Sequence, residues 1–186
     1  MSLKNIILIA LFTTLLSCTK EDKLTAYQEK SNELINQILV NNESECSCII
    51  EPDNNESTIQ TLSADNPKRD YKKIIVNELN INDAFLKNSN ELSKFYTLDE
   101  SLNKNYKILK KEELFSLLKK YKGFDKLNEL TKICPKGWFS FSPPIFNETF
   151  DKAIISYSFY LGGSMNLYEF KNGKWEFVKI IEGWIS

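Results

Sequence analysis

The sequence contains no histidine among its 186 residues. This absence excludes the catalytic systems that need an imidazole base, such as the Ser-His-Asp triad and the Cys-His pair. It also excludes histidine-ligated zinc. An enzyme built from this chain would have to depend on carboxylates. We therefore treat an enzymatic function as an alternative to a binding function.

The sequence also lacks an excess of either charge, with 24 basic residues, 25 acidic residues and a formal net charge of −1. Lysine pairs along the chain are offset by acidic side chains in the same regions. A nucleic-acid-binding domain is expected to carry a basic patch or stripe. We therefore expect no nucleic-acid partner.

Long apolar runs are absent except for one, from Ile6 to Leu16, which follows Lys4 and precedes the small residue Ser17. Its eleven residues are too few for a membrane-spanning helix, which needs about 20. A basic start, an apolar middle and a small residue at the end are typical of a secretory signal peptide. The chain is therefore expected to leave the cytoplasm.

The residues that end this run, Leu15-Leu16-Ser17-Cys18, resemble the lipobox of bacterial lipoproteins. The resemblance implies cleavage before Cys18, which then carries the acyl chains, palmitate among them. Acyl chains anchor a protein to a bilayer without spanning it. An ordinary secretory signal in which Cys18 has no role is the alternative.

This interpretation divides the chain into a signal peptide (1–17), a lipidated tether (18–23) and one domain (24–186). Removal of residues 1–17 leaves 169 residues with a net charge of −2, because Lys4 is lost. A chain of that length can form a single domain with its own core.

The residues behind the cysteine, Lys20, Glu21 and Asp22, resemble the surface-export signal of lipoproteins in the Bacteroidetes. The resemblance implies a lipid-anchored protein of the bacterial outer membrane that faces the cell exterior, with outer-membrane lipid as the partner of acylated Cys18. A solvated tether on a protein that faces the periplasm is the alternative.

Hydrophobic spacing predicts an α+β fold in which N-terminal helices pack on one face of a C-terminal antiparallel β-meander. Three-and-four spacing predicts a main helix over 23–41. Helices are also expected at 84–86, 111–121 and 124–131. Strands are expected at 46–50, 74–76, 106–109, from 138, 153–161, 165–170 and 175–181. The expected connections are a surface loop over 51–70, a turn at Gly162-Gly163 and a hairpin at Asn172-Gly173.

The C-terminal segment, from Trp138 onward, resembles uncharacterised exported proteins of the Bacteroidetes. The resemblance lies in Ser142-Pro143-Pro144-Ile145-Phe146-Asn147, Ala153, Tyr157, Gly162-Gly163, Tyr168 and Asn172-Gly173-Lys174-Trp175. It implies no activity. Cysteines that such proteins often carry around the glycine turn are missing here, so any role of those cysteines is missing too.

Three cysteines remain after Cys18 is assigned to lipid, and an exported protein can form disulfides. We expect one of Cys46 and Cys48 to pair with Cys134, which leaves one thiol unpaired. A three-thiolate metal site is the alternative, but no fourth ligand is evident. The sequence predicts no cofactor and no catalytic residue.

Aromatic residues of the C-terminal strands are the candidate ligand-binding residues, because Tyr and Trp combine apolar area with a polar group. They are Tyr157, Tyr160, Tyr168, Trp175 and Trp184. Aromatic residues at strand spacing also form cores, and that alternative stays open.

The resulting hypothesis is a membrane-anchored binding or interaction module whose partner is an unknown protein, peptide or glycan. One alternative is a small hydrolase without histidine, in which Glu169 and Glu176, on either side of the hairpin, would act as paired carboxylates. The other is a structural subunit of an envelope complex that docks through the helix over 23–41.

Overall fold

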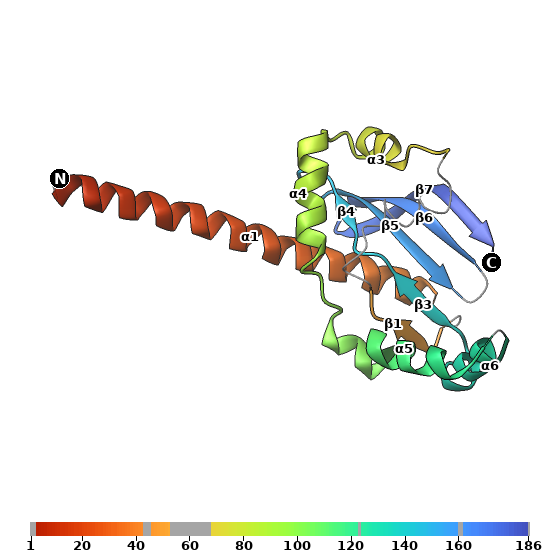
Figure 1. Ribbon diagram of the computed structural model, residues 1–186. Helices are drawn as coiled ribbons and strands as arrows, with labels where there is room; N and C mark the ends of the chain where they lie inside the picture. Colours follow the sequence, from red (N-terminus) through yellow and green to blue (C-terminus); the bar gives the residue numbers. More distant parts are fainter. Residues whose placement is uncertain (1–2, 43–45, 53–67, 123, 160–161, 186) are drawn as a thin grey trace.

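The computed structural model describes residues 3–42, 46–52, 68–122, 124–159 and 162–185, and for residues 3–20 it describes the backbone alone. In this part of the chain five α-helices accompany one seven-stranded sheet, in agreement with the α+β class (Figure 1). The helices are α1 (Leu3–Asn41), α3 (Tyr71–Leu79), α4 (Asp83–Ser93), α5 (Lys111–Lys120) and α6 (Phe124–Ile133), with a 3-10 helix, η2, at Glu100–Lys104. The strands are β1 (Cys48–Ile50), β2 (Lys107–Leu109), β3 (Trp138–Phe141), β4 (Ile145–Phe146), β5 (Lys152–Phe159), β6 (Gly162–Lys171) and β7 (Lys174–Ile185).

The sheet is mixed, with the strand order β2-β1-β3-β5-β6-β7 and β4 paired beside β5. β1 runs parallel to both β2 and β3, and every other pairing is antiparallel. The predicted antiparallel meander is therefore wrong for the sheet as a whole. β1 and β2 are separated in the chain by helices, and such crossover connections allow parallel pairing, which residue spacing within a strand does not reveal.

Helix α1 covers one face of the sheet through the apolar stripe that its sequence predicts. It is longer than the predicted span of 23–41, and its N-terminal half extends away from the sheet (Figure 1). The stripe lies in one buried cluster with side chains of β1, β3, β4, β5, β6 and β7. Its members are 0–2 % exposed: Tyr27, Leu34, Ile35, Ile38 and Leu39.

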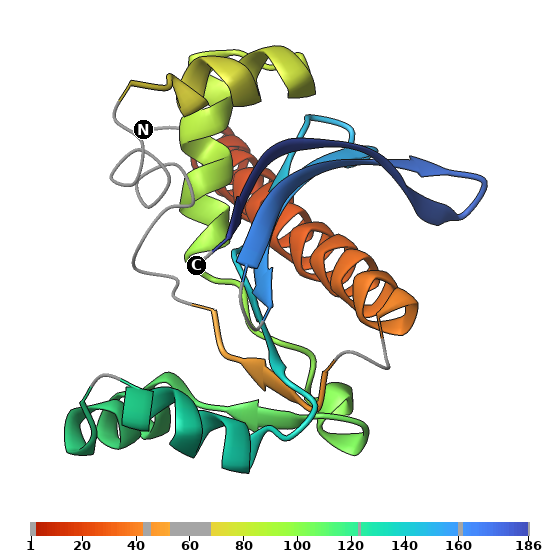
Figure 2. The same cartoon turned by 90° about the vertical axis from the view of Figure 1, so that its right-hand side faces the viewer.

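The opposite face of the sheet is also covered by helices, so the prediction of helices on one face only is wrong. Along β5, Ala153 and Ile155 lie in the cluster with α1, whereas Ile154 lies in a second cluster with α3 and α4. This alternation is the period of a strand that is buried on both faces. α5 and α6 pack on the same side over β1 and β2, in a third cluster that includes Leu109 and Leu130. Figure 2 shows the two helix pairs separately, above and below.

Helix α3 replaces the strand predicted at 74–76. Asp70 caps its N-terminus by accepting a hydrogen bond from the Lys73 amide at 3.0 Å. Tyr71, Ile75 and Leu79 lie four residues apart and are buried together. The β-branched residues at 74–76 favour a strand locally. Burial of the stripe formed by Tyr71, Ile75 and Leu79 against the sheet outweighs that weak preference.

Most other local predictions are confirmed. Asn82 caps α4, with its side chain accepting from the Phe85 amide at 2.8 Å, although α4 continues to Ser93 rather than ending at 86. α5 and α6, together with β1, β2, β3, β5, β6 and β7, all overlap their predicted spans. The predicted loop over 51–70 lies mostly outside the described residues.

The β6–β7 hairpin turns at Asn172-Gly173, as predicted. Both residues have positive φ angles, 53° and 79°, which two-residue hairpin turns of the primed type require. β7 is the edge strand that follows, and side chains occupy part of its outer edge. The Gln37 amide of α1 accepts from the Trp175 N–H at 2.9 Å and donates to the Trp175 carbonyl. Arg69 donates to the Ile181 carbonyl at 3.0 Å, so the edge is covered at two places, Trp175 and Ile181.

Gly162 and Gly163 do not form the predicted turn, because both lie within β6 and neither has a positive φ angle. Gly163 instead allows a close approach between neighbouring strands. A Cβ atom at this position would lie 2.4 Å from the Trp184 ring and 2.7 Å from the Tyr157 carbonyl oxygen. The glycine therefore makes room for the Trp184 side chain against the sheet.

We predict that Gly163→Ala lowers the free energy of unfolding by about 1–3 kcal/mol, the usual effect of overpacking. Gly183→Ala is the matched control, because its added Cβ would meet no atom closer than 3.9 Å. Chemical denaturation of the two variants checks this. Equal stability of both would contradict the account of Gly163.

Candidate functional site

The proposed anchor and export residues belong to the first half of α1. Cys18 and Lys20 lie in its described backbone, as does the whole lipobox, but their side chains are outside the described part. Glu21 and Asp22 are exposed. Among the described residues, no helix combines the length and apolar character that crossing a membrane requires.

The candidate aromatic residues do not gather into one cleft. Trp175 and Tyr168 are 2 % and 8 % exposed and lie in the core cluster beneath α1, with Tyr157 packed against it. Trp184 packs against the cluster on the other face of the sheet. Tyr160 lies outside the described residues.

Ring contacts explain why these aromatic residues stabilise the core. Trp175 has its ring centroid 5.2 Å from that of Phe170 and 5.8 Å from that of Phe146. Tyr168 is enclosed enough that burial raises the pKa of its hydroxyl. Three of the five candidates thus contribute apolar packing beneath α1.

The paired carboxylates of the hairpin, Glu169 and Glu176, lie directly opposite each other on β6 and β7. Glu169 forms ion pairs with Lys171 and, at 3.1 Å, with Lys152, and these lysines lower the pKa of its carboxyl. Glu176 pairs with Lys174 at 3.5 Å. A general acid in glycoside hydrolysis needs a raised pKa, so Glu169 is tuned in the opposite direction.

The cysteines form a disulfide between Cys48 and Cys134, one of the two pairings that the sequence allows. It joins β1 to the residue that follows α6, in the buried cluster on that face. Cys46 is a buried free thiol whose pKa is raised by burial. The described residues contain no group of three or more potential metal ligands.

An exposed apolar surface, which the sequence analysis missed, runs along β7. This β7 apolar surface consists of Phe177, Val178, Ile180 and Ile185, which are 42–92 % exposed. Phe177 and Ile180 stand opposite Tyr168 and Asn166 of β6, at positions that point to the same face of the sheet. The signal in the sequence is the pair of apolar doublets at 177–178 and 180–181, which break the alternation of a half-buried strand.

The alternation breaks because β7 contains two irregularities. Its register against β6 shifts between Met165 and Asn166, and again between Leu167 and Tyr168. Each shift leaves an extra residue in β7, which is the geometry of a β-bulge. Such bulges interrupt the regular in-and-out alternation of side chains along the edge strand.

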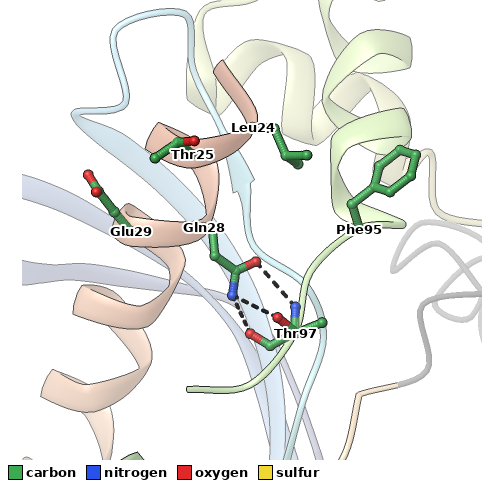
Figure 3. A pocket seen from close by; sticks show the side chains of 6 residues that line it. All are labelled: Leu24, Thr25, Gln28, Glu29, Phe95 and Thr97. Atoms are coloured by element: carbon green, nitrogen blue, oxygen red, sulfur yellow. Dashed lines mark hydrogen bonds between the residues drawn. The ribbon is translucent and has the colours of Figure 1, made fainter. Parts of the chain in front are cut away.

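A shallow hollow of about 340 Å³ lies where α1 meets the end of α4 (Figure 3). This α1–α4 hollow is lined by Leu24, Thr25, Gln28, Glu29, Phe95 and Thr97. The Gln28 side chain closes its floor by donating to the Thr97 carbonyl and accepting from the Thr97 amide at 3.2 Å.

Comparisons with protein-family models, with curated proteins and with solved structures find no match to this chain.

We predict that Trp175→Ala lowers the free energy of unfolding by about 3–5 kcal/mol, because it removes a large buried ring. Phe177→Ala, two residues along the same strand and 56 % exposed in the parent, should have an effect of less than about 1 kcal/mol. Thermal unfolding distinguishes the two. A Trp175→Ala variant that kept the parent melting temperature would show that this ring is not part of the core.

Proposed function

We propose that this protein is a lipid-anchored bacterial lipoprotein that faces the cell exterior and binds a partner through the β7 apolar surface. The anchor and orientation rest on the resemblances of Leu15-Leu16-Ser17-Cys18 and of Lys20-Glu21-Asp22 to known signals. The binding role rests on one observation, the exposure of four large apolar side chains along a single edge strand.

Contiguous exposed apolar side chains are unusual on a protein that acts alone, and they commonly mark an interaction site. Phe177 and Ile180 are 56 % and 60 % exposed, although buried positions lie directly opposite on β6. Covering them with a partner would therefore remove substantial apolar area from water. A protein or peptide with an apolar face is the best match to this surface.

The alternatives have less support. A carboxylate hydrolase would need a pair of acids with different pKa values in a concave site, whereas Glu169 and Glu176 are ion-paired to lysines on a hairpin. A subunit that docks through α1 would leave its apolar stripe uncovered, whereas Leu34, Ile35 and Ile38 are 0–2 % exposed beneath the sheet.

The binding role predicts contact at Phe177 in living cells. A photo-activatable p-benzoylphenylalanine in place of Phe177 should form a discrete covalent adduct with a partner on intact cells. The same residue in place of Phe115 is the matched control, because Phe115 on α5 is equally suitable by exposure, at 59 %.

Adducts at position 177 that are absent at position 115 would support the proposal. Their specificity can be tested with Ile180→Ser, which shortens the apolar surface at an exposed position and should reduce the adduct. Equal labelling at positions 177 and 115, or none at either, would overturn the binding role of β7.

A further inference from the structure

At the rim of the α1–α4 hollow lies an aromatic side chain that takes no part in the buried core. Phe95 is 59 % exposed at this rim, beside the half-buried Leu24 (Figure 3). Its backbone is nevertheless fixed, since the Phe95 amide donates to the Leu92 carbonyl at 3.0 Å. The next residue, Tyr96, is 1 % exposed. The Phe95 ring is therefore held outward by a well-packed segment.

The rim lies close to the proposed lipid anchor at Cys18. Cys18 and Leu24 belong to the same continuous helix, six residues apart. At 1.5 Å per residue, they are separated by about 9 Å along the helix axis. In Figure 1 the end of α4 lies beside α1 where that helix leaves the body of the protein. A tilt of α1 toward the side that carries Phe95 brings Leu24 and Phe95 closer to the plane that contains Cys18.

We propose that the rim of the α1–α4 hollow, formed by Leu24 and Phe95, rests on the lipid bilayer that holds the acylated Cys18. This inference depends on the proposed function, because it requires the acyl group. Aromatic side chains favour the boundary between headgroups and acyl chains. The rim thus supplies a second membrane contact beside the covalent one.

The charges around the rim indicate a neutral lipid surface. Among the described side chains at the start of the domain and at the end of α4, exposed acidic residues outnumber exposed basic ones, and Lys94 is paired with Glu91 at 2.8 Å. The acids are Glu21, Asp22, Glu29 and Glu91, and the basic residues are Lys23 and Lys94. These charges favour a contact that depends on apolar burial in zwitterionic lipid over one that depends on attraction to anionic lipid.

A second contact would fix the orientation of the domain. With Cys18 and Phe95 both at the bilayer, the domain could not pivot freely about its anchor. The C-terminal end of β7 lies on the side of the molecule opposite the projecting half of α1 (Figure 1). The contact would therefore turn the end of β7 away from the membrane.

The test uses the acylated protein, which begins at Cys18 after cleavage, in phosphatidylcholine vesicles with and without brominated acyl chains, which quench tryptophan on contact. Phe95→Trp should lose fluorescence in the brominated vesicles. Phe115→Trp is the matched control, because Phe115 has the same 59 % exposure on α5, and it should keep its fluorescence. The three native tryptophans are common to both variants, and both should keep the parent melting temperature.

The outcomes separate this inference from the function on which it rests. Quenching at position 95 but not at 115, on protein whose mass shows an acyl group at Cys18, is the expected result. Vesicle-bound, acylated protein with equal fluorescence changes at both positions would overturn the membrane contact and leave the lipoprotein proposal intact. Protein without an acyl group at Cys18 would overturn both.

Discussion

The burial of the α1 stripe against the sheet is the interaction on which the rest of the structure depends. Tyr27, Leu34 and Ile38 fill the core together with residues from six strands. The same helix reaches the edge strand, where Gln37 binds the backbone of Trp175 as a neighbouring strand would. Because α1 precedes every strand in the chain, the core forms only when the first and last segments of the sequence meet.

Because α1 is packed into the core, its apolar stripe is not part of the surface that a partner could bind. The apolar face of the helix is not available to a partner, and the ion pairs of Glu169 and Glu176 remove the obvious acid pair from consideration. The exposed apolar side chains of the described residues include Phe177 and Ile180 on the bulged strand β7 and Phe95 at the rim of the α1–α4 hollow. Gln37 and Arg69 bind the backbone of the β7 edge at Trp175 and Ile181, which limits strand addition and leaves its side chains as the available surface.

Local signals in the sequence predicted the elements that local chemistry determines. The N-cap Asn82, the Asn172-Gly173 turn and the spacing of α1 and α5 each act within a few residues. Predictions failed where distant contacts decide. Residues 74–76 are helical because Ile75 is buried against the sheet in that conformation. Gly163 leaves space for the Trp184 ring and does not form a turn. The parallel pairing of β1 and the exposure of β7 likewise depend on which strands become neighbours, which no residue spacing encodes.

The central claim is that a core helix continues directly into a lipid anchor that displays the domain outside the cell. Protease treatment of intact cells tests it most directly, comparing the parent with a variant in which Lys20, Glu21 and Asp22 are all replaced by alanine. The account predicts that the parent is digested without cell lysis while the variant is protected. Protection of both proteins would contradict outward display and would place the domain in the periplasm.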